Sequence, residues 1–569
     1  MIRQQLQESI REAILRAQQA GDLPPGEVPQ VELETPRQAE HGDYASNVAL
    51  VLARSMGLPP RRVAEAIARH LRLPPEKVER VEIAGPGFLN FFLSPSWLQE
   101  VVRVVLEKGE RYGRWDVGRG IRVHVEYVSA NPTGPLHVGT ARNGAIGDCI
   151  ANLLDALGFE VFREYYLNDY GAQVLALARS VACRYAELFG RSLPFPEDGY
   201  RGEYVVEIAR KIAERDGPRW LDAPEEERNA YFREFALTEI VGDIRRTLEA
   251  FGIRFDGWFS EAGLYARSDF QKTLELLRAR GALYEEGGAL WFRATAFGDE
   301  RDRVVIRSDG TPTYLGGDIA YRRSIYERGF QRLINVLGID HQGQVRSLKA
   351  AVQAMGYDPE TLEVILYQHV LFRRGGESVR MSRRAGEIVT LQDLLETVGA
   401  DAARYFLVMT NPSTPLEFDL DLAVKQSSEN PVYYVQYAHA RICSILREAS
   451  KHPVGREFVV ANPGDPHVHL NEARDLDLST LIHETERALM RKLADFPDVV
   501  FTAGMRREPH RLCAFAQELA TAFHVFYTQC RVLTDDPELT GARLALVDAT
   551  RVVLRKTLQL IGVSAPERM

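Results

Sequence analysis

The chain has 569 residues, of which 45% are hydrophobic and 26% are charged, a balance typical of a globular protein with more than one core. No apolar run of roughly 18 residues occurs and the N-terminus lacks the apolar segment of a signal peptide, so we expect a cytoplasmic protein without a membrane span. The net charge of −9 argues mildly against a small basic nucleic-acid-binding module, although a large acidic protein can still carry local basic faces.

The cysteines are scattered along the chain and form no C-x-x-C pair. This distribution argues against both a disulfide framework and a structural zinc site, so no bound metal is expected from these residues. Each thiol is predicted to be a small buried hydrophobic group: Cys149, Cys183, Cys443, Cys513 and Cys530.

Residues 1–110 are predicted to form a separate α+β domain. A first helix over residues 1–20 is expected to end at the Gly/Pro-rich stretch 21–26, and a short strand at 31–34 follows it. Apolar residues at helical spacing predict two more helices, and alternating residues predict two paired strands. These helices are residues 43–53 and 61–71, and the strands are residues 78–83 and 88–93.

Residues 111–390 are predicted to form a Rossmann-type domain. The chain here runs strand, Pro/Gly loop, helix and strand, which is the βαβ unit of a doubly wound parallel sheet, over residues 121–128, 130–135, 137–157 and 161–166. Helical segments dominate from about 171 to 251, and residues 255–259 are interpreted as a turn. Later strand-like runs are expected to complete the sheet, at residues 304–308, 332–337 and 361–371.

From residue 391 the pattern is helical almost to the end. Residues 391–425 are predicted to be a helical connection to a C-terminal bundle over 426–569, and the Pro-, Gly- and His-rich stretch 451–472 is expected to be a loop. The long helical segments of the bundle are residues 426–450, 478–495, 508–530 and 541–561. The predicted fold class is α/β: a Rossmann-type doubly wound parallel-sheet domain between an α+β N-terminal domain and an all-α C-terminal domain.

The loop after the first strand of the central domain ends in Pro135-Leu136-His137-Val138-Gly139-Thr140. A helix N-terminus offers unpaired N–H groups and a partial positive charge to a phosphate. Gly139 would let a base or ribose pack against the backbone, and the His137 imidazole can donate to a phosphoryl oxygen as charge develops. A helix whose first turn merely carries His and Gly would show the same pattern, so the motif gains meaning only from the segments that follow it.

Further segments with polar side chains follow other strands of this sheet. Gly338-Ile339-Asp340 comes after the strand at 332–337, where a carboxylate can reach ribose hydroxyls. The stretch 378–386 carries Arg380, Arg383 and Arg384, and mobile cations there could close over a triphosphate. On charge alone this stretch would be a solvated surface. The order of the segments, one after each strand, favours a nucleotide site.

Together these motifs resemble those of class I aminoacyl-tRNA synthetases, and the sequence is most similar to the arginine enzymes. His137-Val138-Gly139-Thr140 stands at the first signature of that class, and Arg380-Met381-Ser382-Arg383-Arg384 stands at the second. Thr140 replaces the second histidine of the first signature, and two arginines replace the lysines of the second. The similarity to arginine enzymes continues over residues 42–45, 84–90, 125–140, 389–406, 430–442 and 565–569.

The resemblance implies ATP-dependent ligation of L-arginine to tRNA(Arg) through an arginyl-adenylate, with Mg²⁺ carried by the ATP. It implies ATP contacts at Pro135, Leu136, His137, Gly139, Thr140, Gly338, Asp340, His341, Val370, Arg380 and Met381, and catalytic roles for His137, Gly139, Thr140, Met381, Ser382 and Arg383. A threonine hydroxyl cannot carry imidazolium charge, and arginine keeps the charge of lysine with a different geometry. We expect activity to survive both changes.

A guanidinium substrate requires carboxylates in its plane and favours an aromatic wall. The resemblance implies that Glu261 and Asp318 hold the guanidinium and that Tyr314, four residues before Asp318 on a predicted helix face, packs on it. It assigns the α-amino and α-carboxylate end to Glu126, Ser129, Asn131 and Gln342 or Gln344. Any one of these carboxylates alone would be taken as a solvated surface group, and only their convergence in the fold favours a cation pocket.

The resemblance also implies that the helical C-terminal domain contacts the anticodon. The segment 430–441 is rich in aromatic residues and has a basic edge, so unpaired bases could stack on its tyrosines, whereas Val432 and Val435 are expected in the helix core. The N-terminal domain is expected to touch the tRNA elbow, and the family expectation is a monomer. The predicted tRNA contacts are Asn90, Phe92, Tyr433, Tyr437 and Arg441.

Three other interpretations remain open from the sequence. A different class I synthetase would keep the nucleotide site but lack the acidic pocket. A nucleotidylyltransferase outside the synthetases would keep the two signatures but would not need the helical C-terminal half. A non-enzymatic tRNA-binding relative would keep the RNA-contacting surfaces with a damaged active site, and Thr140 is the one residue that points to it.

Overall fold

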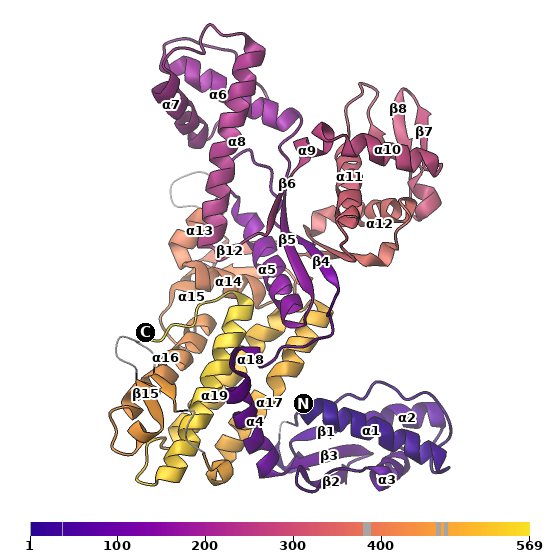
Figure 1. Cartoon of the computed structure of the whole chain (residues 1–569), viewed down its shortest axis with the longest axis vertical. Coiled ribbons are helices and arrows are strands. Elements are labelled where there is room, and N and C mark those ends of the chain that lie inside the picture. The colour runs from indigo at the N-terminus through magenta and orange to yellow at the C-terminus, as the bar shows by residue number, and fades with distance from the viewer. Residues whose placement is uncertain (1, 37, 379–388, 462–467, 472–475) are drawn as a thin grey trace.

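The computed structural model describes residues 2–36, 38–378, 389–461, 468–471 and 476–569. Figure 1 shows the N-terminal domain as a separate lobe beside the long C-terminal helices, with a parallel sheet near the middle of the molecule and further lobes above and to one side of it. Within the described residues, no helix is both long and apolar enough to cross a membrane.

The N-terminal lobe packs helices on an antiparallel sheet of order β1–β3–β2, from the elements α1 (Ile2–Gln19), η1 (Ala39–His41), β1 (Tyr44–Ser46), α2 (Val48–Met56), α3 (Pro60–His70), β2 (Val78–Ala84) and β3 (Phe88–Leu93). The first helix, the helix near 61–71 and the paired strands are confirmed. The strand predicted at 31–34 is wrong and leaves only a bridge between Glu34 and Ala45. The helix predicted from residue 43 begins later, because residues 44–46 pair with β3.

Polar side chains fasten the N-terminal lobe to the long helix α17 (Glu484–Arg506). Tyr44 is fully buried, and its hydroxyl donates to Asp495 at 2.9 Å. Arg491 pairs with Asp43 at 3.1 Å, and Asp43 also accepts the backbone N–H of Leu93 at 2.7 Å. Buried polar groups are stable only when they are hydrogen-bonded, so these contacts fix the position of the lobe on the helix.

A parallel sheet of order β11–β10–β4–β5–β6 occupies the middle of the molecule, with strands β4 (Arg122–Glu126), β5 (Glu160–Leu167), β6 (Gly257–Ser260), β10 (Arg332–Gly338) and β11 (Leu362–Tyr367). All neighbouring pairs are parallel, which confirms the Rossmann-type sheet. The turn predicted at 255–259 is wrong. Pairing with the edge of β5 gives this short segment strand geometry despite its Asp256-Gly257 turn chemistry.

The run at residues 304–308 does not join this sheet, contrary to the prediction. It belongs to a separate antiparallel sheet of β7 (Leu283–Glu286), β8 (Ala289–Phe292) and β9 (Arg303–Ile306). Gly287 and Gly288 join β7 to β8 with φ angles of 59° and 76°, the left-handed geometry of a tight hairpin. Partners that are close in sequence need less loop closure, so this segment pairs locally.

The run at residues 361–371 is divided between two sheets. Its first part is β11, and its last residues begin a sheet of β12 (Val370–Arg374), β13 (Glu377–Ser378) and β14 (Leu416–Asp419). Because β14 lies within 391–425, the prediction of a wholly helical connection there is wrong. The alternating burial of residues 416–419 is the strand pattern that the helical prediction overlooked.

The helices around the parallel sheet are η3 (Val138–Thr140), α5 (Ala141–Ala156), α6 (Ala172–Leu188), α7 (Glu203–Asp216), α8 (Glu225–Ala250), α9 (Glu261–Ala266), α10 (Asp269–Ala279), η4 (Ala294–Phe297), α11 (Tyr314–Glu327), η5 (Ile339–Gln344), α12 (Val345–Ala354) and η6 (Pro359–Thr361). The helix predicted from 137 to 157 is confirmed as η3 followed by α5. Helices α6 and α7, with the upper end of α8, form the lobe at the top of Figure 1, and α9 to α12 form the lobe at its right with β7 and β8.

The C-terminal part is formed by α4 (Pro95–Lys108) from the chain before the sheet, with η2 (Gly109–Arg111), and by α13 (Leu391–Val398), α14 (Ala400–Val408), α15 (Leu420–Val424), α16 (Pro431–Ala449), η7 (Gly455–Glu457), β15 (Val459–Ala461), β16 (Val468–Leu470), η8 (Leu478–Thr480), α17, α18 (His510–Gln529) and α19 (Pro537–Ile561). The four long helices are confirmed as elements, but the one predicted at 478–495 is α17, which begins at Glu484 and continues to Arg506, while residues 478–480 form η8. The loop predicted at 451–472 is wrong in part, because β15 and β16 pair there as antiparallel strands.

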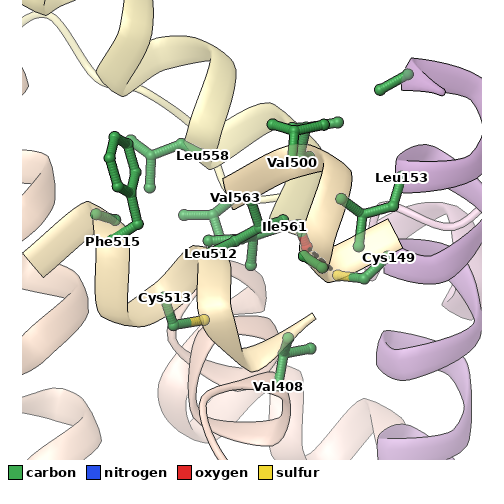
Figure 2. Packing of buried hydrophobic residues seen from close by; sticks show 14 of the residues in the cluster. Cys149, Leu153, Val408, Val500, Leu512, Cys513, Phe515, Leu558, Ile561 and Val563 are labelled. Carbon is green, nitrogen blue, oxygen red and sulfur yellow. Dashed lines mark hydrogen bonds between the residues drawn. The ribbon is translucent and has the colours of Figure 1, made fainter. Parts of the chain in front are cut away.

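Figure 2 shows where α5 meets the C-terminal helices. The thiol of Cys149 donates to the carbonyl of Ile561 at 3.1 Å, and Leu153, Val500 and Leu558 are buried around this contact. All five cysteines are buried and unpaired, as predicted. The middle of α5, the helix that follows the His137 motif, therefore contacts the end of the last helix of the chain.

Candidate active site

The chain after β4 adopts a backbone conformation that L-residues rarely take. Val128 and Ser129 have φ angles of 66° and 41°, and such strain persists only where the surroundings hold it. The Asn143 side chain on α5 accepts the backbone N–H of Val128 at 2.6 Å and donates to the carbonyl of Val336 on β10 at 2.8 Å. Asn143 therefore ties the ends of β4 and β10 together at the start of α5.

The turn that follows is built around His137. Its Nδ1 accepts the backbone N–H of Gly139 at 3.0 Å, so the proton of the neutral ring lies on Nε2. Partial burial lowers the pKa of His137 and favours this neutral form. A Cβ on Gly139 would stand 3.1 Å from Nδ1, so glycine leaves room for the contact. The Nε2–H group of His137 is the donor that this turn can present to a ligand.

The backbone N–H groups of the same turn are already used. Val138 donates to the carbonyl of Val389 at 2.9 Å, and Thr140 donates to the carbonyl of His137 at 2.9 Å. The Thr140 hydroxyl donates to that same carbonyl at 2.7 Å. The expectation that this helix start offers unpaired N–H groups to a phosphate is therefore wrong for these residues, because the 3₁₀ turn and the bridge to residue 389 satisfy them.

A cavity of about 820 Å³ opens beside this turn. It lies at the carboxyl ends of β4, β5 and β10, the edge where parallel sheets bind ligands, and α11 forms part of its wall. It brings together most of the residues predicted to bind arginine and some of those predicted to bind ATP: Glu126, Ser129, Asn131, Thr140, Glu261, Tyr314, Asp318, Gly338, Asp340, His341 and Gln344.

Glu126 is the last residue of β4 and is 8% exposed. Burial raises the pKa of its carboxyl group, and the nearby Arg322 guanidinium opposes that rise. The side chain of Asn335 on β10 donates a hydrogen bond to its Oε2. A cation and an amide donor both favour the ionised carboxylate, so Glu126 is a buried group with support for its charge.

Glu261 is the first residue of α9 and is 6% exposed. Burial, together with the carboxylates of Asp318 and Asp169, raises its pKa to about 7. Its Oε1 accepts the Tyr265 hydroxyl at 3.4 Å, whereas Oε2 is buried without a hydrogen-bond partner among the described residues. A buried acceptor without a donor is costly, so this oxygen marks a place where a ligand can supply one.

Helix α11 presents Tyr314, Asp318 and Arg322 to the cavity at a spacing of four residues. The Arg322 guanidinium pairs with Asp318 Oδ1 at 3.3 Å. Burial raises the pKa of Asp318, and Arg322 opposes the rise. Tyr314 is 61% exposed and therefore stands at the rim, as an aromatic surface that a ligand can cover.

Another part of the cavity wall is formed by Gly338, at the end of β10, and by η5. Asp340 and His341 are exposed there, and Asp340 Oδ1 lies 3.7 Å from His369 Nε2. His341 Nδ1 lies 3.3 Å from Oε1 of Gln344. These polar groups face solvent, in contrast to the buried carboxylates Glu126 and Glu261.

Comparison with known proteins identifies the family. Family models match consecutive parts of the chain: the arginyl tRNA synthetase N-terminal domain over residues 4–93, the catalytic domain of class I (R) tRNA synthetases over residues 101–419, and the DALR anticodon binding domain over residues 435–569. The catalytic-domain match alone spans more than half of the chain. The chain belongs to the arginyl-tRNA synthetase family.

Full-length relatives agree with this membership. The arginine--tRNA ligase of Heliobacterium modesticaldum is 49% identical over 568 residues, which cover 100% of this chain and 99% of that protein. The arginine--tRNA ligase of Geobacillus thermodenitrificans is 49% identical over 570 residues with the same coverage. Among solved structures, the Thermus thermophilus arginyl-tRNA synthetase matches over 100% of both chains, with a TM-score of 0.75 and 25% identity.

Not every predicted residue reaches the cavity. His137 and Gly139 lie next to Thr140, which lines it, but do not line it themselves. Gln342 is exposed on η5, and Val370 begins β12. Pro135 and Leu136 precede the His137 turn, also outside the lining. The second signature lies outside the described residues, and with it Arg380, Met381, Ser382 and Arg383.

The predicted anticodon-contacting residues form one surface of α16. The rings of Tyr433 and Tyr437 are stacked with centroids 6.3 Å apart. Arg441 donates to the Tyr437 hydroxyl at 2.7 Å. All three side chains are partly exposed, whereas Val432 and Val435 are buried, as predicted for the helix core. The surface thus offers aromatic faces beside a cation.

Asn90 and Phe92 on β3 are 4% and 8% exposed. The Arg80 guanidinium lies 3.6 Å from the centroid of the Phe92 ring and covers it. These two predicted tRNA contacts therefore present little surface of their own, and the exposed group at this point of the lobe is Arg80.

Several groups that line the cavity were not predicted from the sequence. Arg322 follows Asp318 by four residues, the spacing of a helical ion pair, and Asn335 is a polar residue inside an apolar strand. Both were visible signals of a buried polar role. Tyr166 at the end of β5 and Asn143 on α5 gave no such signal, because only the fold brings them to the strand edge.

Proposed function

We propose that this chain ligates L-arginine to tRNA(Arg) in an ATP-dependent reaction of two steps. In the first step the arginine carboxylate attacks the α-phosphorus of ATP, which gives arginyl-adenylate and releases pyrophosphate. In the second step a terminal ribose hydroxyl of the tRNA attacks the acyl carbon, and AMP leaves. Neither step needs a nucleophilic side chain, so catalysis consists of positioning and of stabilising developing charge.

The convergence of Glu126, Glu261 and Asp318 in one cavity carries this proposal. The three carboxylates come from β4, α9 and α11 and line a single cavity, which suits a ligand with two positive groups at a distance. In the proposed complex the guanidinium lies between Glu261 and Asp318 and covers the exposed face of Tyr314. The unsatisfied Oε2 of Glu261 accepts one of its N–H groups.

The α-amino and α-carboxylate end of arginine is proposed to lie near Glu126. The backbone strain at Ser129 directs this loop towards the cavity. Asn131 donates to Gln173 Oε1 at 2.7 Å, which leaves its own side-chain oxygen available as an acceptor for an ammonium group. Gln344 lines the opposite wall and Gln342 is exposed beside it, so Gln344 is the better placed of the two to reach the carboxylate.

ATP is proposed to occupy the solvated end of the cavity, with its ribose near Gly338 and Asp340 and its phosphates near His137. The Nε2–H of His137 would donate to the α-phosphate as negative charge develops there. Mg²⁺ enters with the triphosphate, since it retains water and binds through substrate phosphates. The second signature, Arg380 to Arg383, is proposed to hold the leaving pyrophosphate, on the strength of its sequence alone.

The tRNA is proposed to lie along the C-terminal bundle, with anticodon bases stacked on Tyr433 and Tyr437 beside Arg441. A secondary contact of the N-terminal lobe is proposed at the exposed Arg80, which covers Phe92, because Asn90 and Phe92 themselves are buried. We further propose a cytoplasmic monomer of four parts. These are the tRNA-contacting residues 1–110, the catalytic residues 111–390, the connection 391–425 and the anticodon-binding residues 426–569.

Pyrophosphate exchange into ATP, measured with each amino acid in the presence and absence of tRNA(Arg), tests the proposal. We expect exchange with arginine and tRNA present. Exchange with lysine or glutamine but not with arginine would contradict it. Tight tRNA binding without any exchange would instead favour the non-enzymatic relative, whose only support here is Thr140.

A further inference from the structure

Arg322 is a buried cation beside the carboxylates of the cavity. Its side chain is 4% exposed, and it lines the cavity together with Glu126 and Asp318. Its Nη1 donates to the carbonyl oxygen of Asp318 at 3.1 Å and to Oδ1 at 3.3 Å. Its Nε is buried without a hydrogen-bond partner among the described residues. The hydrogen bonds of this side chain therefore go to one residue, Asp318, and they do not use all of its N–H groups.

The carboxylates of the cavity differ in their access to this cation. Arg322 is the main charge opposing the rise of the pKa of Glu126 and of Asp318. Glu261 has no such counter-ion, and burial with the neighbouring acids raises its pKa to about 7. A buried carboxylate without a counter-ion takes up a proton rather than remain charged. Burial raises the pKa of all three carboxyl groups. A cation, Arg322, opposes this rise for Glu126 and Asp318 but not for Glu261.

The charged and titratable groups around this pair come from several elements of the cavity wall. Asp318, Tyr321 and Tyr326 belong to α11 itself, and the loop after it contributes Arg328. The other groups are His124 and Glu126 on β4, Glu164 and Tyr166 on β5, Asp169 after β5, Glu261 and Tyr265 on α9, and His341 on η5. Arg328 pairs with Glu164 at 2.7 Å. Arg303 and Arg307 also line the cavity, but Arg303 pairs with Asp299 at 2.9 Å, and Arg307 donates to the Thr311 hydroxyl and to the carbonyl of Pro312. Arg322 is the cavity-lining cation that pairs with Asp318.

We propose that Arg322 is a positioning residue that keeps Asp318 and Glu126 ionised and fixed while the cavity is empty, so that the pocket is ready for a cationic amino acid. The inference rests on the proposed function, because it concerns how the same cavity binds arginine. The role does not require Arg322 to touch the substrate. Its effect reaches the ligand through the two carboxylates.

Removing Arg322 has two opposite consequences, and pH decides which one dominates. Without the cation, Asp318 and Glu126 become protonated at a higher pH, and arginine binding weakens when they are neutral. Once both are ionised, the missing cation no longer repels the substrate guanidinium. A nearby opposite charge shifts a carboxyl pKa by about 1–3 units, and each unit changes the ratio of charged to neutral forms about tenfold. The loss of arginine affinity must therefore shrink as pH rises.

The decisive experiment is the KM for arginine of the full chain from about pH 6.5 to pH 8.5, at saturating ATP and tRNA, for wild type and Arg322→Gln. We expect KM to rise on the order of ten- to a hundredfold at the acidic end and to approach the wild-type value at the alkaline end, with kcat changed less than KM. Arg322→Lys restores the charge and should recover most of the affinity at low pH.

Arg323→Gln is the matched control. It removes the same charge one residue away, from a side chain that binds Glu327, Thr273 and the carbonyl of Asp269 outside the cavity lining, and its pH profile should follow wild type. A KM increase in Arg322→Gln that is equal at every pH would indicate packing or direct contact with substrate and would overturn the inference. An unchanged KM would overturn it as well.

Proton release on arginine binding tests the same point without a variant. Titration calorimetry of the wild type near pH 6.5 in two buffers of different ionisation enthalpy should give fewer than one proton released per arginine, because only Glu261 still needs to ionise. Release of more than one proton would show that Asp318 or Glu126 is neutral in the empty cavity, which contradicts the inference. A wild type that binds no arginine at all would overturn the proposed function itself.

Discussion

The two proposed parts of the site, which we call the nucleotide end and the amino-acid end, are built in different ways. At the proposed nucleotide end Thr140 and Asp340 line the cavity and His137 lies next to Thr140, and all three are at least partly exposed. Their geometry depends on the backbone turn at His137 and on η5. At the amino-acid end, Glu126 and Glu261 are buried and come from different elements. Burial raises the pKa of Glu126, and burial with neighbouring carboxylates raises the pKa of Glu261.

This difference matches the two tasks proposed for the site, which are binding a triphosphate and recognising a guanidinium. In the proposed complex the triphosphate would bring its own charge and its own metal ion, so the protein would need only positioned donors at that end. A guanidinium must instead be distinguished from neutral groups of similar shape, and buried carboxylates that lose their partner impose a large penalty on the wrong ligand. Substitutions at the two ends should therefore change different kinetic parameters: the KM for arginine at the amino-acid end, and the rate of adenylate formation at the nucleotide end.

The largest effect is expected from Asp318→Asn, at the amino-acid end. The Asp318 side chain is 33% exposed in the empty cavity, and the bound guanidinium would cover it. Truncating one partner of the charge pair that binding buries in this way typically weakens binding by about 2–5 kcal/mol, so kcat/KM for arginine should fall on the order of a thousandfold, mainly through KM. Aminoacylation at varied arginine concentrations measures this. Glu327→Gln, on the same helix but outside the cavity lining, is the control. A loss of less than about fivefold in Asp318→Asn would place the guanidinium elsewhere.

The next largest effect is expected from His137→Ala, at the nucleotide end. Removing one donor to developing charge slows the chemical step by about 10²–10³, so single-turnover formation of adenylate should slow by that factor. The KM for arginine should remain close to wild type, in contrast to Asp318→Asn. An intact exchange rate would show that this turn does not contact the reacting phosphate.

The pH dependence of wild-type binding should show an intermediate effect. The pKa of Glu261 is raised to about 7 in the empty cavity, and the bound guanidinium favours its ionised form, so affinity rises with pH through this value and levels off above it. Between pH 6 and 8 the KM for arginine should fall about tenfold. Glu261→Gln should remove this dependence while raising KM. A KM that rises with pH over this interval would contradict the assignment.

The smallest effect is expected from Thr140→His. The Thr140 hydroxyl is engaged with the carbonyl of His137 at 2.7 Å, so it is not directed as a donor at a phosphate. Restoring the family's histidine should change kcat by no more than about threefold, a small fraction of the effect of a positioned donor. A gain near a hundredfold would instead show that the nucleotide end is impaired in this chain.

Sequence patterns predicted the structure correctly where it depends on a single helix or on the order of neighbouring elements. The βαβ order fixed the parallel sheet, and the spacing of Tyr314 and Asp318 placed both on one face of α11. The predictions failed where several strands compete for the same pairing partner. Most of the segment 255–259 belongs to an edge strand. Part of the segment 304–308 pairs with a neighbouring hairpin. Neither outcome is written in the segment itself, because it depends on which strand edge lies within reach.

The pKa values of the carboxyl groups in the site could not be predicted from the sequence either. Glu261, Glu126 and Asp318 were identified as ligands by resemblance, but nothing in their neighbours along the chain indicates that Glu261 titrates near neutral pH. That property follows from burial beside Asp318 and Asp169, which come from other elements. The role of Arg322 needed the same information, although its spacing from Asp318 was visible throughout.

We propose that the carboxylates of the cavity, Glu261 and Asp318, select a guanidinium. Comparing kcat/KM for arginine with that for citrulline, whose neutral ureido group has nearly the same shape, tests it most directly. We expect the wild type to prefer arginine on the order of 10⁴-fold, as sites with buried polar groups reject ligands that leave them unpaired, and Asp318→Asn to reduce that preference sharply. Use of citrulline within about tenfold of arginine, below the discrimination of even an apolar pocket for one methylene, would contradict the account.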